Sequence, residues 1–208
     1  TAVPLVGKAA TSVILVVLFF GGQEPPPPEK PKPGPPTIRL SLTRLKPDSV
    51  IDIGGERVMT AGDDGVWVAS REAGTVARID AKTNKPAAPV NVGKEPCAGM
   101  TVGFGTLLVP ICGAPGLARV DLKTNAVTTS AKGFTASIGA PATGVGSIWI
   151  LTDAKGTLTR IDPASNAVVA EIHLGAAAGA LAFGQGAVWV ATASNELLRL
   201  DPYTNVTS

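Results

Sequence analysis

Charged side chains are scarce in this chain of 208 residues. Only 16% of the residues are Asp, Glu, Lys or Arg, against roughly 25% in ordinary soluble domains. The 18 basic and 16 acidic residues are mixed along the chain, and no basic stripe interleaved with aromatic side chains occurs. Because nucleic-acid binding depends on such a stripe, the sequence argues against a nucleic-acid partner.

Histidine and cysteine are scarcer still, with one and two copies. His173 has no evident catalytic partner, so an exposed position on a strand is favoured over a role as a base or metal ligand. Asp63 and Asp64 form a carboxylate pair, but a solvated turn is favoured over a Ca²⁺ site because no other acids surround them. We therefore expect no catalytic residue, no metal site and no cofactor.

Only one long apolar run is present, at residues 9–22, with Lys8 the only charge before it. Its length suits the apolar core of a signal peptide, and it approaches a membrane span only if earlier residues are added. Residues 1–22 are therefore predicted to be a signal peptide or a transmembrane anchor. A buried core helix fits poorly, because polar residues and prolines follow at once.

Proline crowds the next segment, residues 23–37. Proline fixes φ and lacks an N–H group, so this segment favours extended polyproline II. We interpret residues 23–37 as a semi-rigid proline-rich linker between the membrane and a domain. A ligand for a proline-binding module is the second interpretation.

Residues 38–208 contain an internal repeat of about forty residues. Each of four copies has Arg-x-Asp followed, four positions after the Asp, by an Asn that a hydroxyl residue precedes. The repeated residues are Arg78, Asp80 and Asn84; Arg119, Asp121 and Asn125; Arg160, Asp162 and Asn166; and Arg199, Asp201 and Asn205. We expect the Asp and Asn to shape a turn, and the Arg and Asp to form a ladder of pairs from repeat to repeat.

A second anchor lies at a matching place upstream in each copy, directly after a glycine-containing turn. It is a large apolar residue within an apolar triplet: Trp67, Leu108, Trp149 and Trp189. Short strands at this period predict an all-β fold, a β-propeller of four-stranded blades. The anchors are then expected to form the core between neighbouring blades.

The predicted propeller spans residues 38–208. It divides into a partial blade at 38–54 and repeats at 55–93, 94–133, 134–175 and 176–208. In the second repeat, strands are expected at residues 99–102, 107–111, 117–121 and 126–129. The number of visible repeats is small for a propeller, so we expect the chain to be part of a ring of about six to eight blades, or to be completed by a partner.

The segments Val66-Trp67-Val68-Ala69, Ala77-Arg78-Ile79-Asp80 and Thr83-Asn84 resemble the repeats of bacterial YVTN-type and virginiamycin B lyase-like propellers. The resemblance covers roughly residues 50 to 208 and implies the fold more than a function. Streptogramin lyases of this type use paired histidines, a glutamate and Mg²⁺ near the channel mouth. A chain with one histidine is not expected to have that activity.

Cys97 and Cys112 flank the turn at residues 103–106 symmetrically. If Gly103 and Thr106 pair across that turn, the two cysteines lie opposite each other on neighbouring strands, within disulfide range. A structural disulfide is predicted, and two buried thiols are the alternative. An exported chain would oxidise the pair.

These features together predict an exported, membrane-tethered propeller in the periplasm or at the cell surface. It would act as a non-enzymatic binding, sensor or protein-interaction module, with an unknown protein or small-molecule ligand at one end of the channel. One alternative is a lyase-like enzyme whose catalytic blades lie outside this chain, and another is a structural subunit that completes its propeller with a partner. Asn205-Val206-Thr207 also matches the N-glycosylation acceptor pattern, which is a weak signal.

Overall fold

The computed structural model describes residues 46–53, 57–63, 65–114, 116–130 and 139–207. The predicted segments 1–22 and 23–37 lie outside these residues, as does most of the predicted partial blade, whose described residues 46–53 carry no strand. Residues Pro47–Ser208 form one compact unit, and all its described elements are β-strands. Within the ranges given above, no helix is long and apolar enough to cross a membrane.

The strands form four antiparallel sheets, which we call the first to fourth blades. The first blade contains β1 (Arg57–Gly62), β2 (Gly65–Ser70), β3 (Thr75–Asp80), β4 (Lys85–Pro86) and β5 (Val90–Asn91). The second contains β6 (Thr101–Gly103), β7 (Thr106–Ile111), β8 (Gly116–Asp121) and β9 (Val127–Ser130). The third contains β10 (Ala142–Gly144), β11 (Ser147–Leu151), β12 (Thr157–Ile161) and β13 (Val168–His173). The fourth contains β14 (Ala178–Gly184), β15 (Ala187–Thr192) and β16 (Leu197–Leu200), with an isolated bridge from Leu200 to Thr207.

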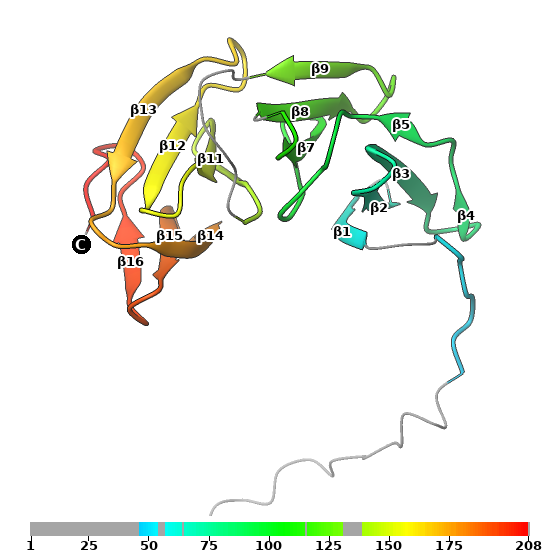
Figure 1. Cartoon of the computed structure of the whole chain (residues 1–208), viewed down its shortest axis with the longest axis horizontal. Coiled ribbons are helices and arrows are strands. Elements are labelled where there is room, and N and C mark those ends of the chain that lie inside the picture. The colour runs from blue at the N-terminus through cyan, green and yellow to red at the C-terminus, as the bar shows by residue number, and fades with distance from the viewer. Residues whose placement is uncertain (1–45, 54–56, 64, 115, 131–138, 208) are drawn as a thin grey trace, which may run out of the picture. The chain divides into compact units, whose positions relative to one another are not determined.

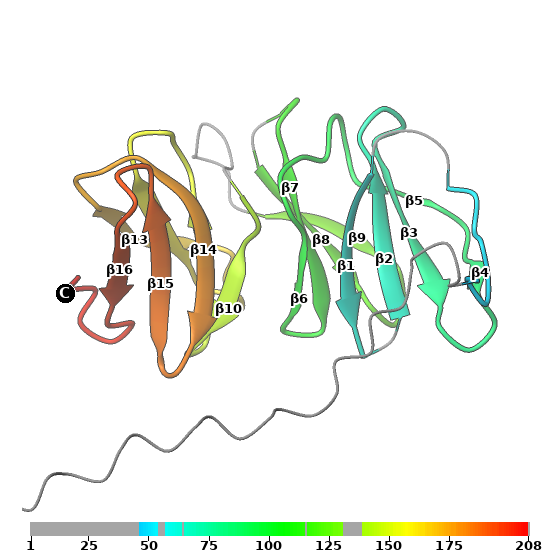
Figure 2. The ribbon, with the colours of Figure 1, turned by 90° about the horizontal axis from the view of Figure 1, so that it is seen from below.

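The four blades follow one another as in a propeller, which confirms the predicted fold class (Figure 1). The first strands of consecutive blades, β1, β6, β10 and β14, contact one another in chain order and line up side by side in Figure 2. Chain order within each sheet is also spatial order, except that β4 and β5 both pair with β3. This outer strand is split in two because Pro86 and Pro89 have no N–H group to donate.

Two-residue turns connect the first and second strands of the last three blades. Phe104 and Gly105 both have positive φ, at 53° and 70°, and the turns at Val145 and Gln185 repeat this pattern. Positive φ at both central residues identifies a type I′ turn, whose twist matches that of the flanking strands. The glycine in the second position makes this conformation accessible.

Three apolar cores lie between the blades, one at each junction. Trp67 belongs to the core between the first and second blades, Leu108 to the next and Trp149 to the third. Their exposed fractions are 1%, 0% and 0%. The structure thus places these three anchors between neighbouring blades, while Trp189, in the fourth blade, is half-buried.

Two arginines of the repeat contact the following blade, as a ladder from repeat to repeat requires, but their hydrogen-bond partners there are not aspartates. Arg119 reaches from the second blade to the turn of the third, where Nη1 donates to the Pro163 carbonyl and to Asn166 Oδ1. Arg160 repeats the contact one blade later, with Nη1 3.0 Å from the Pro202 carbonyl oxygen and 3.4 Å from Asn205 Oδ1. Arg119 and Arg160 therefore join neighbouring blades through a turn carbonyl and an asparagine, while Asp121 and Asp162 are hydrogen-bonded within their own turns.

Each aspartate of the repeat caps its own turn. Oδ1 of Asp121 accepts the N–H groups of Lys123 and Thr124 and the Thr124 hydroxyl, at 2.8–2.9 Å. Asp80 and Asp162 do the same, and Asp201 accepts two backbone N–H groups. The asparagine that ends each turn is left-handed, with φ between 55° and 59°: Asn84, Asn125, Asn166 and Asn205.

These hydrogen bonds predict a loss of stability in acid. The backbone N–H of Thr124, and then its hydroxyl, lower the pKa of Asp121 below its ordinary 3.8, and Ser165 lowers the pKa of Asp162 in the same way. A carboxyl group whose pKa is lower in the folded state contributes stability above its unfolded pKa, and that stability is lost as the pH falls through the folded pKa. The melting temperature should therefore be flat above about pH 4 and fall below it.

The double variant D121N/D162N should show a shallower acid decline, because an amide does not titrate. Circular dichroism melts at a series of pH values measure this, with Glu171→Gln on the outer strand β13 as the control. A double variant that keeps the full acid decline of the unmodified chain would contradict the assignment.

Candidate functional site

A polar groove of about 660 Å³ lies where the β2–β3 loop meets the connection from β5 to the second blade. This connection joins the outer strand of the first blade to the inner strand of the second. The lining residues are Arg71, Glu72, Ala73, Gly74, Asn91, Gly93, Lys94 and Glu95. The groove is open to solvent, and both signs of charge line it.

Two glycines let the walls of the groove approach each other. The N–H of Val92 donates to the Gly74 carbonyl at 2.9 Å, and the N–H of Gly93 donates to Asn91 Oδ1 at 3.0 Å. Gly74 has a φ of +67°, and a Cβ atom added there would lie 2.5 Å from the Gly93 carbonyl oxygen. A larger residue at position 74 would therefore push the connection away from the loop.

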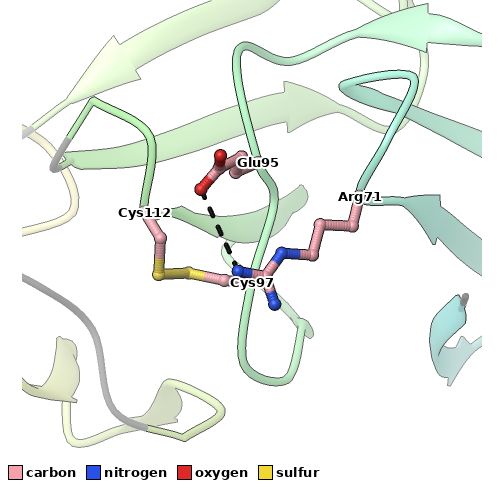
Figure 3. Close-up of a disulfide and its surroundings, with 4 residues drawn as sticks. All are labelled: Arg71, Glu95, Cys97 and Cys112. Atoms are coloured by element: carbon pink, nitrogen blue, oxygen red, sulfur yellow. Dashed lines mark ion pairs between the residues drawn. A yellow bond between two sulfur atoms is a disulfide. The ribbon is translucent and has the colours of Figure 1, made fainter.

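Arg71 and Glu95 face each other across the groove (Figure 3). The distance from Arg71 Nη2 to Glu95 Oε2 is 3.9 Å, and the two side chains are 51% and 56% exposed. An ion pair this exposed contributes about 0–1 kcal/mol to stability. The pair is consequently weak enough to open for a ligand that offers better partners.

A disulfide between Cys97 and Cys112 fixes the connection beside the groove (Figure 3). The predicted disulfide is thus present, with a Cα–Cα distance of 5.8 Å. The N–H of Cys112 donates to the Glu95 carbonyl at 3.0 Å, and the N–H of Gly113 donates to the Lys94 carbonyl at 3.2 Å. The backbone of the two charged groove residues is therefore held by the loop that follows β7.

The register that suggested this disulfide is wrong. Gly103 pairs with Thr106 as expected, but the bridge further along joins Pro96 to Ile111, so the pairing has slipped before it reaches the cysteines. The N–H of Cys97 accordingly donates to the Pro110 carbonyl, and the cysteines are diagonal neighbours rather than opposite residues. Their Cα atoms are still within the usual disulfide range of about 4.4–6.8 Å.

His173 lies at the end of the outer strand β13 and is exposed. Its Nδ1 is 3.2 Å from Thr157 Oγ1, on the neighbouring strand. The cross-strand pair of Thr157 and His173 matches the pair of Thr75 and Asn91 in the first blade. Among the residues that the structure describes, no second ionisable side chain forms a hydrogen bond or an ion pair with the imidazole of His173.

The other candidate residues stay apart from the groove. Asp63 is exposed in its turn, and Asp64 lies outside the described residues. Among the residues with a described placement, no cluster of three or more His, Cys, Asp or Glu could hold a metal ion. Asn205, in the glycosylation pattern, is half-buried and accepts a hydrogen bond from Arg160.

Sequence reasoning missed the groove residues Arg71, Lys94 and Glu95. These three residues do not recur from blade to blade, so the repeat pattern carries no information about them. Charged residues that break the repeat, in loops rather than strands, were the signal that could have found them.

No protein-family model matches the sequence, and a search of curated proteins finds no match. Solved structures do show the same fold. A catalytically inactive variant of virginiamycin B lyase from Staphylococcus aureus, determined with quinupristin, aligns with a TM-score of 0.65 at 16% identity. The alignment covers 76% of this chain but only 56% of the lyase, so the chain spans little more than half of that protein.

Two further structures extend the comparison. BamB from Moraxella catarrhalis aligns over 67% of this chain and 40% of its own, with a TM-score of 0.56 at 14% identity. The computationally designed Ika4 protein aligns over 76% of this chain and 99% of its own, with a TM-score of 0.62 at 14% identity. Identities this low establish a shared fold and leave the function to be argued from the site.

Proposed function

We propose that this chain is a non-enzymatic binding module that holds a polar peptide segment of another protein in the groove beside its disulfide. The proposal depends on one observation, the groove itself, which is lined by charged side chains. The backbone that carries two of them, Lys94 and Glu95, is held in place by the Cys97–Cys112 disulfide and by hydrogen bonds to the Lys94 and Glu95 carbonyls. Groups held in place before binding lose less entropy on association, so such a groove is suited to recognition.

The chemistry of the lining favours a peptide that carries charges of both signs. Arg71 and Lys94 supply donors for a carboxylate, while Glu72 and Glu95 supply acceptors for an ammonium or guanidinium group. A mixed-charge segment can therefore replace the long Arg71–Glu95 contact with closer pairs. A ligand of one charge sign would leave half of the lining unpaired.

The environments of the repeat aspartates and of His173 also favour a role in binding over a role in catalysis. The repeat aspartates, Asp80, Asp121, Asp162 and Asp201, all have a lowered pKa because their own turns donate to them. Such carboxylates are poor general acids or bases at neutral pH, since they stay ionised and already hydrogen-bonded. His173 stands on an outer strand, so no observation favours the lyase reaction for the described residues.

We place this module outside the cytoplasm and tether it through residues 1–22. Disulfides persist in oxidising compartments, so the Cys97–Cys112 bond supports an extracytoplasmic location. The proline-rich residues 23–37 would then hold the propeller away from the membrane surface.

Selection from a phage-displayed library of random peptides tests the proposed function. Peptides enriched on the full chain should be polar and of mixed charge, and the double variant R71E/K94E should bind them at least about tenfold more weakly, which corresponds to about 1.4 kcal/mol. Isothermal titration calorimetry of one synthetic peptide measures this ratio. The control is the double variant K82E/K123E, which makes the same charge change in the turns that follow β3 and β8.

Two results would refute the proposed function. One is a library that yields no peptide above background on the unmodified chain. The other is a peptide whose affinity falls equally in R71E/K94E and in K82E/K123E, because the groove would then contribute nothing specific.

A further inference from the structure

The outer strand of the third blade, β13, has an unpaired edge. Among the described strands only β12 pairs with it, and Figure 1 shows β13 at the outer rim of its blade. The strand lies inside the chain, with two blades before its sheet and one after it. The open edge is therefore a feature of the third blade itself, because an outermost strand has no strand beyond it.

β13 lacks the features that usually protect an edge strand from further pairing. Protected edge strands are short, or they carry proline or lysine. Pro86 and Pro89 interrupt the outer strand of the first blade, and β9 in the second blade has only four residues. β13 has six residues without proline or lysine, and Val168 and Val169 at its start are 38% and 55% exposed. Such an edge is a template for a further strand.

The ladder between β12 and β13 shows which backbone groups of β13 point outward. The N–H of Leu174 donates to the Gly156 carbonyl at 2.9 Å, and the ladder continues in regular register back to residue 170. Hydrogen-bonded and non-hydrogen-bonded pairs alternate in an antiparallel ladder, so the backbone groups of Ile172 also point to β12. Those of Glu171 and His173 point away from it, toward the open edge.

These outward groups are complementary to themselves in one antiparallel register. If Glu171 faces His173 of a second copy, the N–H and C=O groups of both residues are paired on both strands. The twofold axis then passes between the two Ile172 residues. A register that set Glu171 opposite Glu171 would place two carboxylates side by side, and like charges in that position are destabilising. The first register places each carboxylate opposite an imidazole instead.

We propose that β13 pairs with β13 of a second copy in this register, so that two third blades form one continuous sheet. Twofold symmetry makes the contact self-complementary and closes the assembly at two chains. Ile172, which packs against the core between the third and fourth blades, adds an apolar cross-strand contact at the axis. The contact is independent of the proposed peptide groove, whose lining lies in the first blade and the connection after it.

Sedimentation velocity of the full chain in mild detergent, over a dilution series up to about 0.5 mM, tests this pairing. A strand pair buries less than the roughly 1,200 Å² of a stable complex, so the dimer fraction should rise with concentration. Glu171→Pro should raise the dissociation constant at least about tenfold, because it removes an outward N–H without removing a bond to β12.

Val127→Pro on the outer strand β9 is the matched control. The N–H of Asp121 donates to the Ala126 carbonyl, so the backbone groups of Val127 likewise point away from β8. This variant loses an outward N–H in another blade and should dimerise like the unmodified chain. Circular dichroism of both proline variants should match that of the unmodified chain, since neither change removes a hydrogen bond within a blade.

Cysteine cross-linking tests the register separately. Residues 171 and 173 of the two copies should have Cα atoms about 5.5 Å apart, which a disulfide can span. A mixture of Glu171→Cys and His173→Cys should therefore yield cross-linked dimers on non-reducing gels, whereas neither variant alone should. Both side chains are exposed, so these changes leave the core of the blade intact.

Four results would overturn the proposal. The first is an unmodified chain that stays monomeric at the highest concentration, and the second is a dimer that Glu171→Pro and Val127→Pro weaken equally. The third is a mixture of the two cysteine variants that forms no cross-link. The fourth is efficient cross-linking of Glu171→Cys alone, because residue 171 would then face itself.

Discussion

Replacing Trp149 with alanine is expected to lower the free energy of unfolding by about 3–5 kcal/mol. The indole is 0% exposed and belongs to the core between the third and fourth blades. Its Nε1 donates to the Gly144 carbonyl at 3.3 Å, and the Arg160 guanidinium lies 5.1 Å from the ring centre. Truncation removes the apolar contacts, the hydrogen bond and the cation–π contact together.

Urea denaturation followed by circular dichroism measures this loss. Trp149→Phe should cost less than alanine, because a ring still fills most of the space while the hydrogen bond is lost. Val169→Ala, at an exposed position on β13, should change the free energy of unfolding by less than about 0.5 kcal/mol. A loss of under about 1 kcal/mol for Trp149→Ala would mean that this tryptophan does not hold the two blades together.

The strands were predictable because their signals are local and recur. In the second blade, strands expected at residues 107–111 and 117–121 are found at Thr106–Ile111 and Gly116–Asp121. A short run of buried, mostly apolar residues beside a glycine-containing turn indicates such a strand within one repeat, and four copies of the pattern remove most of the ambiguity. The large apolar anchors follow from the same repeat.

Contacts between blades were harder to predict because they depend on distances that the pattern does not contain. The spacing of Arg119 and Asp121 places both on one face of β8, which suggested mutual pairs. The turn had already engaged the carboxylate, so the arginine reached the next blade's Asn166 instead. Asp121 therefore hydrogen-bonds to Thr124 in its own turn instead of to an arginine.

The groove was unpredictable for a different physical reason. Its connection leaves the repeat register near Ala98, which has a positive φ of 55°. The slip moves Pro96 opposite Ile111 and brings Lys94 and Glu95 alongside the loop after β7. Such a slip is set by non-local hydrogen bonds, and no spacing in the sequence encodes it.

Removing the disulfide is expected to lower the free energy of unfolding by about 3 kcal/mol, because it closes a loop of about fifteen residues in the unfolded chain. The cysteines are separated by 15 positions, and the Cys97 side chain is 7% exposed. The variant C97S/C112S should show this loss in urea denaturation. The unmodified chain unfolded in the presence of dithiothreitol should show a similar loss, since both lack the cross-link.

The same variant separates the scaffold role of the disulfide from its role at the groove. The N–H groups of Cys112 and Gly113 donate to the Glu95 and Lys94 carbonyls, so loosening this loop should speed amide hydrogen exchange at both donors. Exchange at Val109, in the core strand β7, should change only as far as the global loss of stability requires. Equal acceleration at all three amides would show that the bond stabilises the whole blade and does not specifically hold the groove, whereas selective acceleration ties it to the binding surface.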